Sequence, residues 1–150
     1  MHIVEEWNET LAEKLVAGAH EPHILRWTPR DATERFTDLA TTLAWYEQME
    51  RHVFPLWDGN QLQGITWFSK HPEPVAGADY TFAIRMYEPG VGKGLAEPFV
   101  NAAMETMEQY EMKSVWLDTD ATNERAIHLY KKLGFVEIDA KNGRVLMIRK

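Results

Sequence analysis

The sequence predicts an α/β (α+β) fold in which one sheet carries helices on both faces. Short strand-like runs alternate with runs of helical periodicity along the chain, in an order typical of this class. A length of 150 residues, of which 45% are hydrophobic, suits one domain with a sizeable core. The chain has no internal repeat, low-complexity tract or linker, so we predict a single domain over residues 1–150.

Charge and cysteine content restrict the function. The chain has 16 Lys and Arg residues against 23 Asp and Glu residues, a net charge of -7. This balance argues against nucleic acid as a partner and mildly favours cationic or neutral small substrates. Because the chain has no cysteine, it can form no disulfide, thiolate metal site or cysteine nucleophile. No basic region precedes an apolar run at the N-terminus, and no run approaches the about 18 apolar residues of a membrane span, so we expect a soluble, cytoplasmic protein with no membrane partner.

The first third of the chain is predicted to hold two helices and a short strand. Residues 8–18 show leucines at helical spacing between a capping asparagine and a terminating glycine, so residues 1–21 are a candidate N-terminal helical extension. Residues 23–28 have the pattern of a brief strand. A long helix is predicted to follow over residues 28–53, because a Thr-Pro pair opens an apolar face of helical spacing.

A hairpin is predicted next. Residues 54–57 and 61–68 fit two antiparallel strands joined by a turn at Asp58 and Gly59, and Gly64 marks a candidate bulge. Residues 71–77 contain two prolines and a glycine, which predicts a loop.

The second half alternates strands and helices more regularly. The pattern predicts strands over residues 79–86, 114–118, 135–139 and 145–149, and helices over residues 95–110 and 123–133. Pro98 has no N–H group and fits only the first turn of a helix, so regular helix cannot begin much before Gly94. The amides of the preceding turn therefore stay free.

That glycine-rich turn, residues 87–94, is a candidate anion-binding site. A strand, a turn poor in side chains and a helix start together present unpaired N–H groups. A nucleotide-triphosphate loop needs Ser or Thr after its lysine, but Gly94 follows Lys93. A dinucleotide fingerprint needs a third glycine where Leu95 stands. Both alternatives are set aside.

The turn resembles the acyl-CoA-binding signature of the GNAT superfamily of N-acetyltransferases. The family's turn has Gln or Arg, two variable residues, Gly, one variable residue, then Gly or Ala. Gly94 and Ala96 fill the last two places, and Val91 stands where Gln or Arg is usual. The resemblance implies that the CoA diphosphate binds this turn, formed by Val91, Gly92, Lys93, Gly94, Leu95 and Ala96. Because the Val91 side chain donates no hydrogen bond, we expect weaker CoA binding than in a relative with Arg, by a few kcal/mol at most for one charge-assisted bond.

A second and more specific resemblance lies further along the chain. Seven positions match the family at fixed spacing: Asn123, Ala126, Leu129, Tyr130, Lys132, Gly134 and Phe135. At about 100° per residue, Asn123, Ala126 and Tyr130 share one helix face. Asn123 is also a helix cap by type, and Tyr130 could be a core aromatic. For Asn123 the structural and functional interpretations coexist.

The resemblance implies a GNAT fold: a single mixed, mostly antiparallel sheet of about six to seven strands. It also implies acetyl-CoA as cosubstrate, no metal, and direct transfer of the acetyl group to an amine of a small molecule or peptide. The backbone N–H of Met86 is expected to stabilise the carbonyl oxygen, and Tyr130 to face the departing sulfur. Asn123 and Lys132 are the further cofactor-binding candidates. A homodimer is the oligomer considered.

The general base is less clearly indicated. Several relatives carry Glu at the position of Tyr80, so we consider the neighbouring Asp79 as a catalytic residue, although it lies on the opposite strand face unless a bulge rotates it. His20 and His23 are three residues apart and other histidines are isolated; because none has a second carboxylate or histidine at metal-ligand spacing, we interpret them as surface or core residues. The alternative function is a non-catalytic protein that binds or senses acyl-CoA, which Val91 and the lack of an evident base favour.

Overall fold

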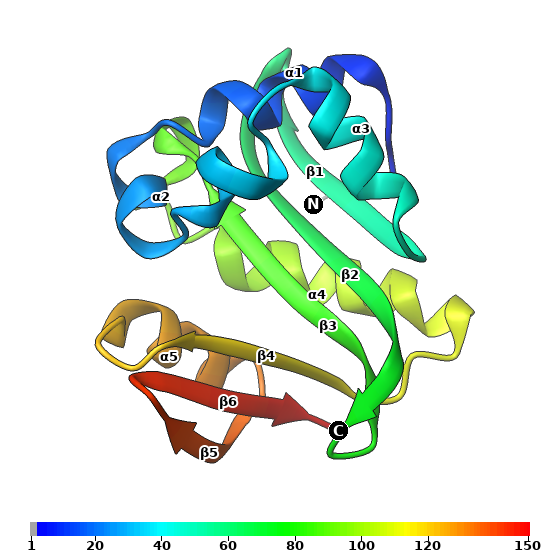
Figure 1. Cartoon of the computed structure of the whole chain (residues 1–150), viewed down its shortest axis with the longest axis vertical. Coiled ribbons are helices and arrows are strands. Elements are labelled where there is room, and N and C mark those ends of the chain that lie inside the picture. Colours follow the sequence, from blue (N-terminus) through cyan, green and yellow to red (C-terminus); the bar gives the residue numbers. More distant parts are fainter. Residues whose placement is uncertain (1–2) are drawn as a thin grey trace.

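In the computed structural model, which describes residues 3–150, six strands form one sheet in the order β1-β2-β3-β4-β6-β5 (Figure 1). Residues 1 and 2, part of the predicted domain, lie outside the described residues. The strands are β1 (Arg51–Asp58), β2 (Gln61–Val75), β3 (Ala78–Met86), β4 (Val115–Asp120), β5 (Val136–Lys141) and β6 (Arg144–Arg149). All neighbouring strands are antiparallel except β3 and β4. The predicted mixed, mostly antiparallel sheet is confirmed.

Helices cover both faces of the sheet. The α-helices are α1 (Glu9–Gly18), α2 (Pro22–Trp27), α3 (Leu39–Glu47), α4 (Ala96–Met107) and α5 (Glu124–Lys132), and shorter turns are η1 (Asp31–Arg35), η2 (Glu88–Gly90) and η3 (Glu108–Tyr110). None of the helices in residues 3–150 is long and apolar enough to cross a membrane.

Each face has its own hydrophobic core. On one face, α4 and α5 pack against sheet residues such as Phe68 and Phe82. On the other face, α1 and α3 pack against Ile65 and Trp67. Leu11 of α1 is fully buried in this second core, so α1 is an integral layer of the domain.

The first hairpin contains a bulge that positions the later glycine-rich turn. Leu56 pairs with Gly64 and Trp57 with Leu62, so Gln63 is the extra residue beside the predicted Gly64. A Cβ atom at Gly90 would lie 2.5 Å from the Gln63 carbonyl oxygen. Glycine at position 90 therefore lets the turn after β3 pack directly on the bulge.

The sheet opens between β3 and β4. These parallel strands pair only at Tyr80 with Val115 and at Thr81 with Trp116, and then diverge (Figure 1). β3 continues to pair with β2 as far as Met86. One edge of β3 therefore has no strand partner beyond Thr81.

Two predictions for the N-terminal half were wrong. Residues 23–28 form helix α2 and not a strand, because Pro22 occupies the first helical position, where its missing N–H costs nothing. The long helix predicted over residues 28–53 is interrupted. Asp38 starts α3 afresh by accepting a hydrogen bond from the Thr41 N–H at 2.8 Å, and the last predicted turn belongs to β1.

The loop predicted over residues 71–77 was also wrong, because β2 continues through most of it. Only Ala76 and Gly77 form the turn, and both have left-handed φ angles, 51° and 85°. Such pairs suit tight hairpins. Regular pairing with β3 is interrupted between Lys70 and Val75, and this interruption accommodates the two prolines.

Candidate active site

A cleft of about 1570 Å³ lies where β3 and β4 diverge, and it reaches both faces of the sheet. The glycine-rich turn and α5 line one half, and α2, η1 and α3 line the other. Most of the predicted site residues line this cleft: Met86, Val91, Gly92, Gly94, Leu95, Ala96, Asn123, Tyr130 and Lys132. Lys93 and Asp79 do not line it.

The glycine-rich turn presents unpaired amides. Gly92 and Gly94 have φ angles of 79° and 69°, a region that favours glycine. Within residues 3–150, none of the amides from Gly92 to Ala96 donates a hydrogen bond to the protein. Helix α4 begins there without a side-chain cap, so its positive end adds to the attraction for an anion. The Val91 side chain is 38% exposed and offers no polar group.

The open edge of β3 carries the expected Met86 amide. The Ile84 carbonyl accepts a hydrogen bond from Arg85 Nη1 at 3.0 Å, and the Met86 carbonyl accepts one from His23 Nε2 at 2.7 Å. Both carbonyls therefore point away from β2. In an antiparallel ladder the N–H and C=O of one residue face the same neighbour. The Met86 N–H therefore faces the cleft.

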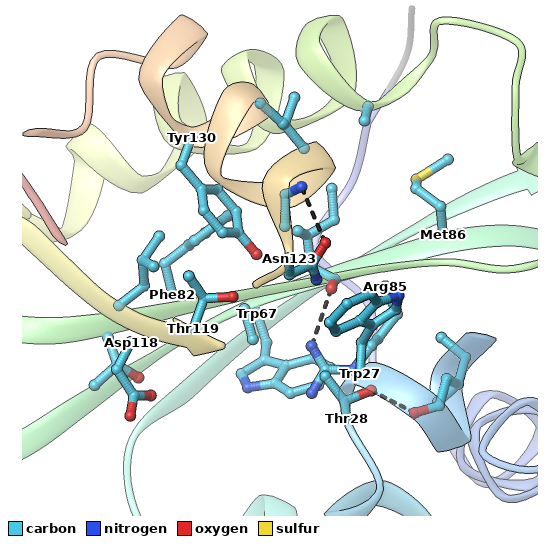
Figure 2. Close-up of a pocket in the computed structure, with 18 of the residues that line it drawn as sticks. Trp27, Thr28, Trp67, Phe82, Arg85, Met86, Asp118, Thr119, Asn123 and Tyr130 are labelled. Carbon is cyan, nitrogen blue, oxygen red and sulfur yellow. Dashed lines mark hydrogen bonds between the residues drawn. The ribbon is translucent and has the colours of Figure 1, made fainter. Parts of the chain in front are cut away.

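Tyr130 extends from α5 into the cleft (Figure 2). Its ring packs edge-on against Phe82, with ring centres 5.9 Å apart. No hydrogen bond from the part of the chain that the structure describes engages its hydroxyl group. Burial raises the pKa of Tyr130 although Arg85 and Arg144 lower it, so the phenol stays neutral and remains a hydrogen-bond donor at neutral pH.

Asn123 caps α5, as its residue type predicts. Its Oδ1 accepts a hydrogen bond from the Ala126 N–H at 3.3 Å, which orients the side chain at the mouth of the cleft (Figure 2). The Nδ2 group makes no hydrogen bond within residues 3–150 and remains available to a ligand.

Asp79 lies at the wrong end of β3 to reach the reacting groups. Seven residues separate it from Met86, a length of about 23 Å at about 3.3 Å per residue. Its neighbour Tyr80 donates a hydrogen bond to Glu50 at 2.8 Å, on the α4 face of the sheet. The pairing irregularity next to Asp79 lies between Lys70 and Val75 of β2, and Asp79 does not line the cleft.

The other half of the cleft is lined and supported by side chains that the sequence did not predict. Asp31 is fully buried, and its two oxygens accept hydrogen bonds from Arg85 Nε at 2.7 Å and Nη2 at 3.1 Å. The Arg85 guanidinium lies 4.8 Å from the centre of the Trp67 ring (Figure 2). Pro22 was the available signal for α2, which brings His23 and its neighbours to the cleft. No local pattern indicates that Asp31 pairs with a residue 54 positions later.

The divided sheet, the unpaired amides and the tyrosine-bearing helix together have the arrangement that the sequence led us to expect for an acyltransferase. Residues 21–135 match the model of the Acetyltransferase (GNAT) family, and the chain belongs to that family. The resemblance stated from the sequence is confirmed.

Relatives and solved structures agree with this assignment. The mycothiol acetyltransferase of Rhodococcus jostii (strain RHA1) is 30% identical over 137 residues, which cover 88% of this chain and 43% of the relative. The chain spans less than half the length of such curated relatives. The structure of AAC(6')-Ib with ribostamycin and coenzyme A has a TM-score of 0.78 at 18% identity, covering 99% of this chain and 92% of that one. The spermidine N-acetyltransferase of Vibrio cholerae with CoA and spermine has a TM-score of 0.74 at 18% identity, covering 98% and 93%. At this identity the two structures share the fold.

Proposed function

We propose that this chain is an acetyl-CoA-dependent N-acetyltransferase that moves an acetyl group directly to an amine of a small molecule or peptide. One observation carries the proposal: a single cleft joins the unpaired amides of residues 92–96, the open edge of β3 and the free phenol of Tyr130. The names of the relatives, a mycothiol acetyltransferase and a spermidine N-acetyltransferase, support the same class of reaction.

The residues present fit the cosubstrate. Unpaired amides at the start of α4 suit a diphosphate, because they supply donors and the helix dipole favours negative charge. Lys132 lines the cleft, and Lys93 is exposed on the glycine-rich turn. Either lysine can add positive charge near the phosphates of the cosubstrate. Val91 removes one donor that the family's turn usually supplies.

Acetyl transfer requires that the acceptor nitrogen bond to the acyl carbon while the carbon–sulfur bond breaks and the amine loses a proton. The Met86 N–H would stabilise negative charge on the carbonyl oxygen. Tyr130 would donate a hydrogen bond to the departing sulfur. Full proton transfer is uphill, because a thiol has a pKa of about 8.5 and the pKa of Tyr130 is raised above that of an ordinary phenol.

The proton of the amine needs an acceptor inside the cleft, and Asp79 lies outside it. We assign this role to His23, acting directly or through water. Its Nε2 donates to the Met86 carbonyl, so the neutral ring has its free electron pair on Nδ1. His23 is thus a base beside the proposed oxyanion donor.

Two measurements on the purified chain test the proposal. Calorimetry should detect acetyl-CoA binding, and a thiol-release assay over a panel of amines should detect turnover. Binding without turnover of any amine would favour the alternative, a non-catalytic acyl-CoA sensor, which Val91 also favours. Absence of acetyl-CoA binding would exclude both functions.

A further inference from the structure

The cleft has a far end, distant from Met86, that is rich in hydrogen-bond donors. Arg51 pairs with Ser69, Ser69 with Thr81, and Thr81 with Trp116, so these four side chains share one face of the sheet. We call them the far row. Thr81 lies five residues before Met86 on β3, which is about 17 Å along the strand. Arg51, Thr81 and Trp116 line the cleft.

Arg51 has no acidic partner. Its guanidinium donates to the Trp45 carbonyl at 2.7 Å, to Ser69 Oγ at 2.6 Å and to Gln48 Oε1 at 3.3 Å, which are all neutral acceptors. No carboxylate in residues 3–150 forms a salt bridge with it. The adjacent Glu50 carboxylate binds His52 and Tyr80 on the opposite face of the sheet.

Arg35 extends this positive region toward the reacting groups. Its Nη1 lies 3.2 Å from Asp31 Oδ1, an oxygen that also accepts a hydrogen bond from Arg85. Burial, together with the charge of Arg35, lowers the pKa of Arg51 to about 10, so Arg51 remains charged at neutral pH. Arg35 and Arg85 therefore share one buried carboxylate, and neighbouring Arg51 forms no salt bridge within residues 3–150, in a protein whose net charge is -7.

Two aromatic side chains at this end of the cleft, Trp116 and His71, form no side-chain hydrogen bond within residues 3–150. The indole N–H of Trp116 is buried and has no hydrogen-bond partner within the described chain. The His71 ring lies 5.8 Å from the Trp116 ring, and burial and the charge of Arg51 lower the pKa of His71. Buried donors without partners are rare and costly, so a ligand that accepts hydrogen bonds fits this end of the cleft.

We propose that the acceptor amine also carries a carboxylate, which binds at the far row between Arg35 and Arg51; this inference rests on the proposed acetyl transfer. A carboxylate would form charge-assisted hydrogen bonds with both guanidinium groups and accept the Trp116 N–H. A polycation would instead be repelled by Arg51, which no carboxylate in residues 3–150 compensates. Because the far row lies well away from Met86, the acceptor is extended, with its amine and carboxylate separated by the length of a short peptide.

Matched peptides test the inference. Thiol release from acetyl-CoA is measured with glycine oligomers of two to five residues, each as the free acid and as the C-terminal amide, and with spermidine. We expect kcat/KM for the longer acids to exceed that of their amides by about 10- to 100-fold, with little difference for the shortest pair. Spermidine should be a poor acceptor.

Substitutions of Arg51 test whether its guanidinium group causes the preference for the free acid. Arg51→Met keeps most of the apolar stem and should remove the preference for the acid, while Arg51→Lys should restore part of it. Arg26→Met is the control, because Arg26 is exposed and does not line the cleft. Its acid preference should stay unchanged.

Three outcomes overturn the inference or separate it from the proposed function. Equal turnover of acids and amides would overturn the carboxylate site and leave the acetyltransferase intact. If acetyl-CoA binds but no peptide is acetylated, calorimetry then measures how tightly the same peptides bind to the CoA-bound protein. If the acids bind more tightly than the amides and Arg51→Met abolishes this difference, the carboxylate site is upheld. Equal binding of acids and amides, or no binding of either, overturns it.

Discussion

The two halves of the cleft are built in different ways, and under the proposed function they would recognise their ligands differently. The half at the glycine-rich turn and α5 uses backbone amides, a helix end and residues close together in the sequence. In the half under α2 and α3, side chains such as Arg85 line the cleft, and the buried Asp31 from a distant segment holds Arg85 in place. Backbone recognition tolerates changes in side chains and suits a cosubstrate common to a family. Side-chain recognition can change with a few substitutions and suits selection of the acceptor.

The largest expected effect is a loss of stability on removal of the Asp31 carboxylate, which holds Arg85 in the half of the cleft under α2 and α3. Asp31→Ala leaves Arg85 buried without its carboxylate, and we expect a loss of about 3 to 5 kcal/mol in the free energy of unfolding. Urea unfolding followed by tryptophan fluorescence measures this loss. Glu34→Ala is the control, because it removes the exposed ion pair with Arg30 and should cost less than about 1 kcal/mol. Equal losses for the two variants would show that the buried pair is not structural.

Tyr130→Phe should separate chemistry from binding in the cosubstrate half. Removal of the donor to the departing sulfur should lower kcat by about 100-fold. The dissociation constant of CoA, measured by calorimetry, should change little. Tyr46→Phe is the control, because that ring stacks on Trp7 away from the cleft. An unchanged kcat in Tyr130→Phe would exclude the phenol from the reaction.

Val91→Arg should strengthen CoA binding, because it adds a side chain that the family's turn usually carries. We expect CoA to bind about 10-fold more tightly, with the gain reduced at high salt. Val136→Arg adds the same charge at an exposed position on β5, outside the cleft, and should not change CoA binding. A similar gain in both variants would indicate only general electrostatic attraction.

Gly92→Ala should weaken CoA binding at the glycine-rich turn, by less than Val91→Arg strengthens it. Alanine is strained at a φ angle of 79°, at a cost of about 1 kcal/mol, and relaxation of the turn would misplace its amides. The matched control is Gly143→Ala, which has a φ angle of 74° in the β5–β6 turn. Both variants should lose stability, but only Gly92→Ala should bind CoA more weakly in calorimetry.

The smallest effect concerns a tyrosine outside both halves. The hydrogen bond that Tyr110 donates to Glu5 raises the pKa of Tyr110 to about 12, above the ordinary value of about 10. Its contribution to stability is therefore complete below pH about 10 and is lost as the pH rises toward 12. Phenolate absorbance should show this late titration, which Tyr110→Phe removes and acetyl-CoA leaves unchanged. A titration of Tyr110 near pH 10 would contradict the folded-state hydrogen bond.

The contrast between the halves also explains which predictions succeeded. The glycine-rich turn and the segment from Asn123 to Phe135 carry their structural determinants within a few residues, as left-handed glycines, a helix cap and a helical face. Local patterns therefore predicted both elements and the family. Net charge favours cationic or neutral substrates, and this stays a prediction; composition does not reveal that arginines gather in one half of the cleft.

By itself, the sequence determined the class of fold, the order of most strands and helices in the second half, and the family, because these depend on local periodicity and short motifs. Only the tertiary structure decided where β3 and β4 separate, which places Met86 in the cleft and Asp79 outside it. It also decided that Asp31 pairs with Arg85 and that, among the described residues, only neutral groups accept hydrogen bonds from Arg51. Such contacts join residues far apart in the chain, so their energies depend on the packed topology and leave no local pattern.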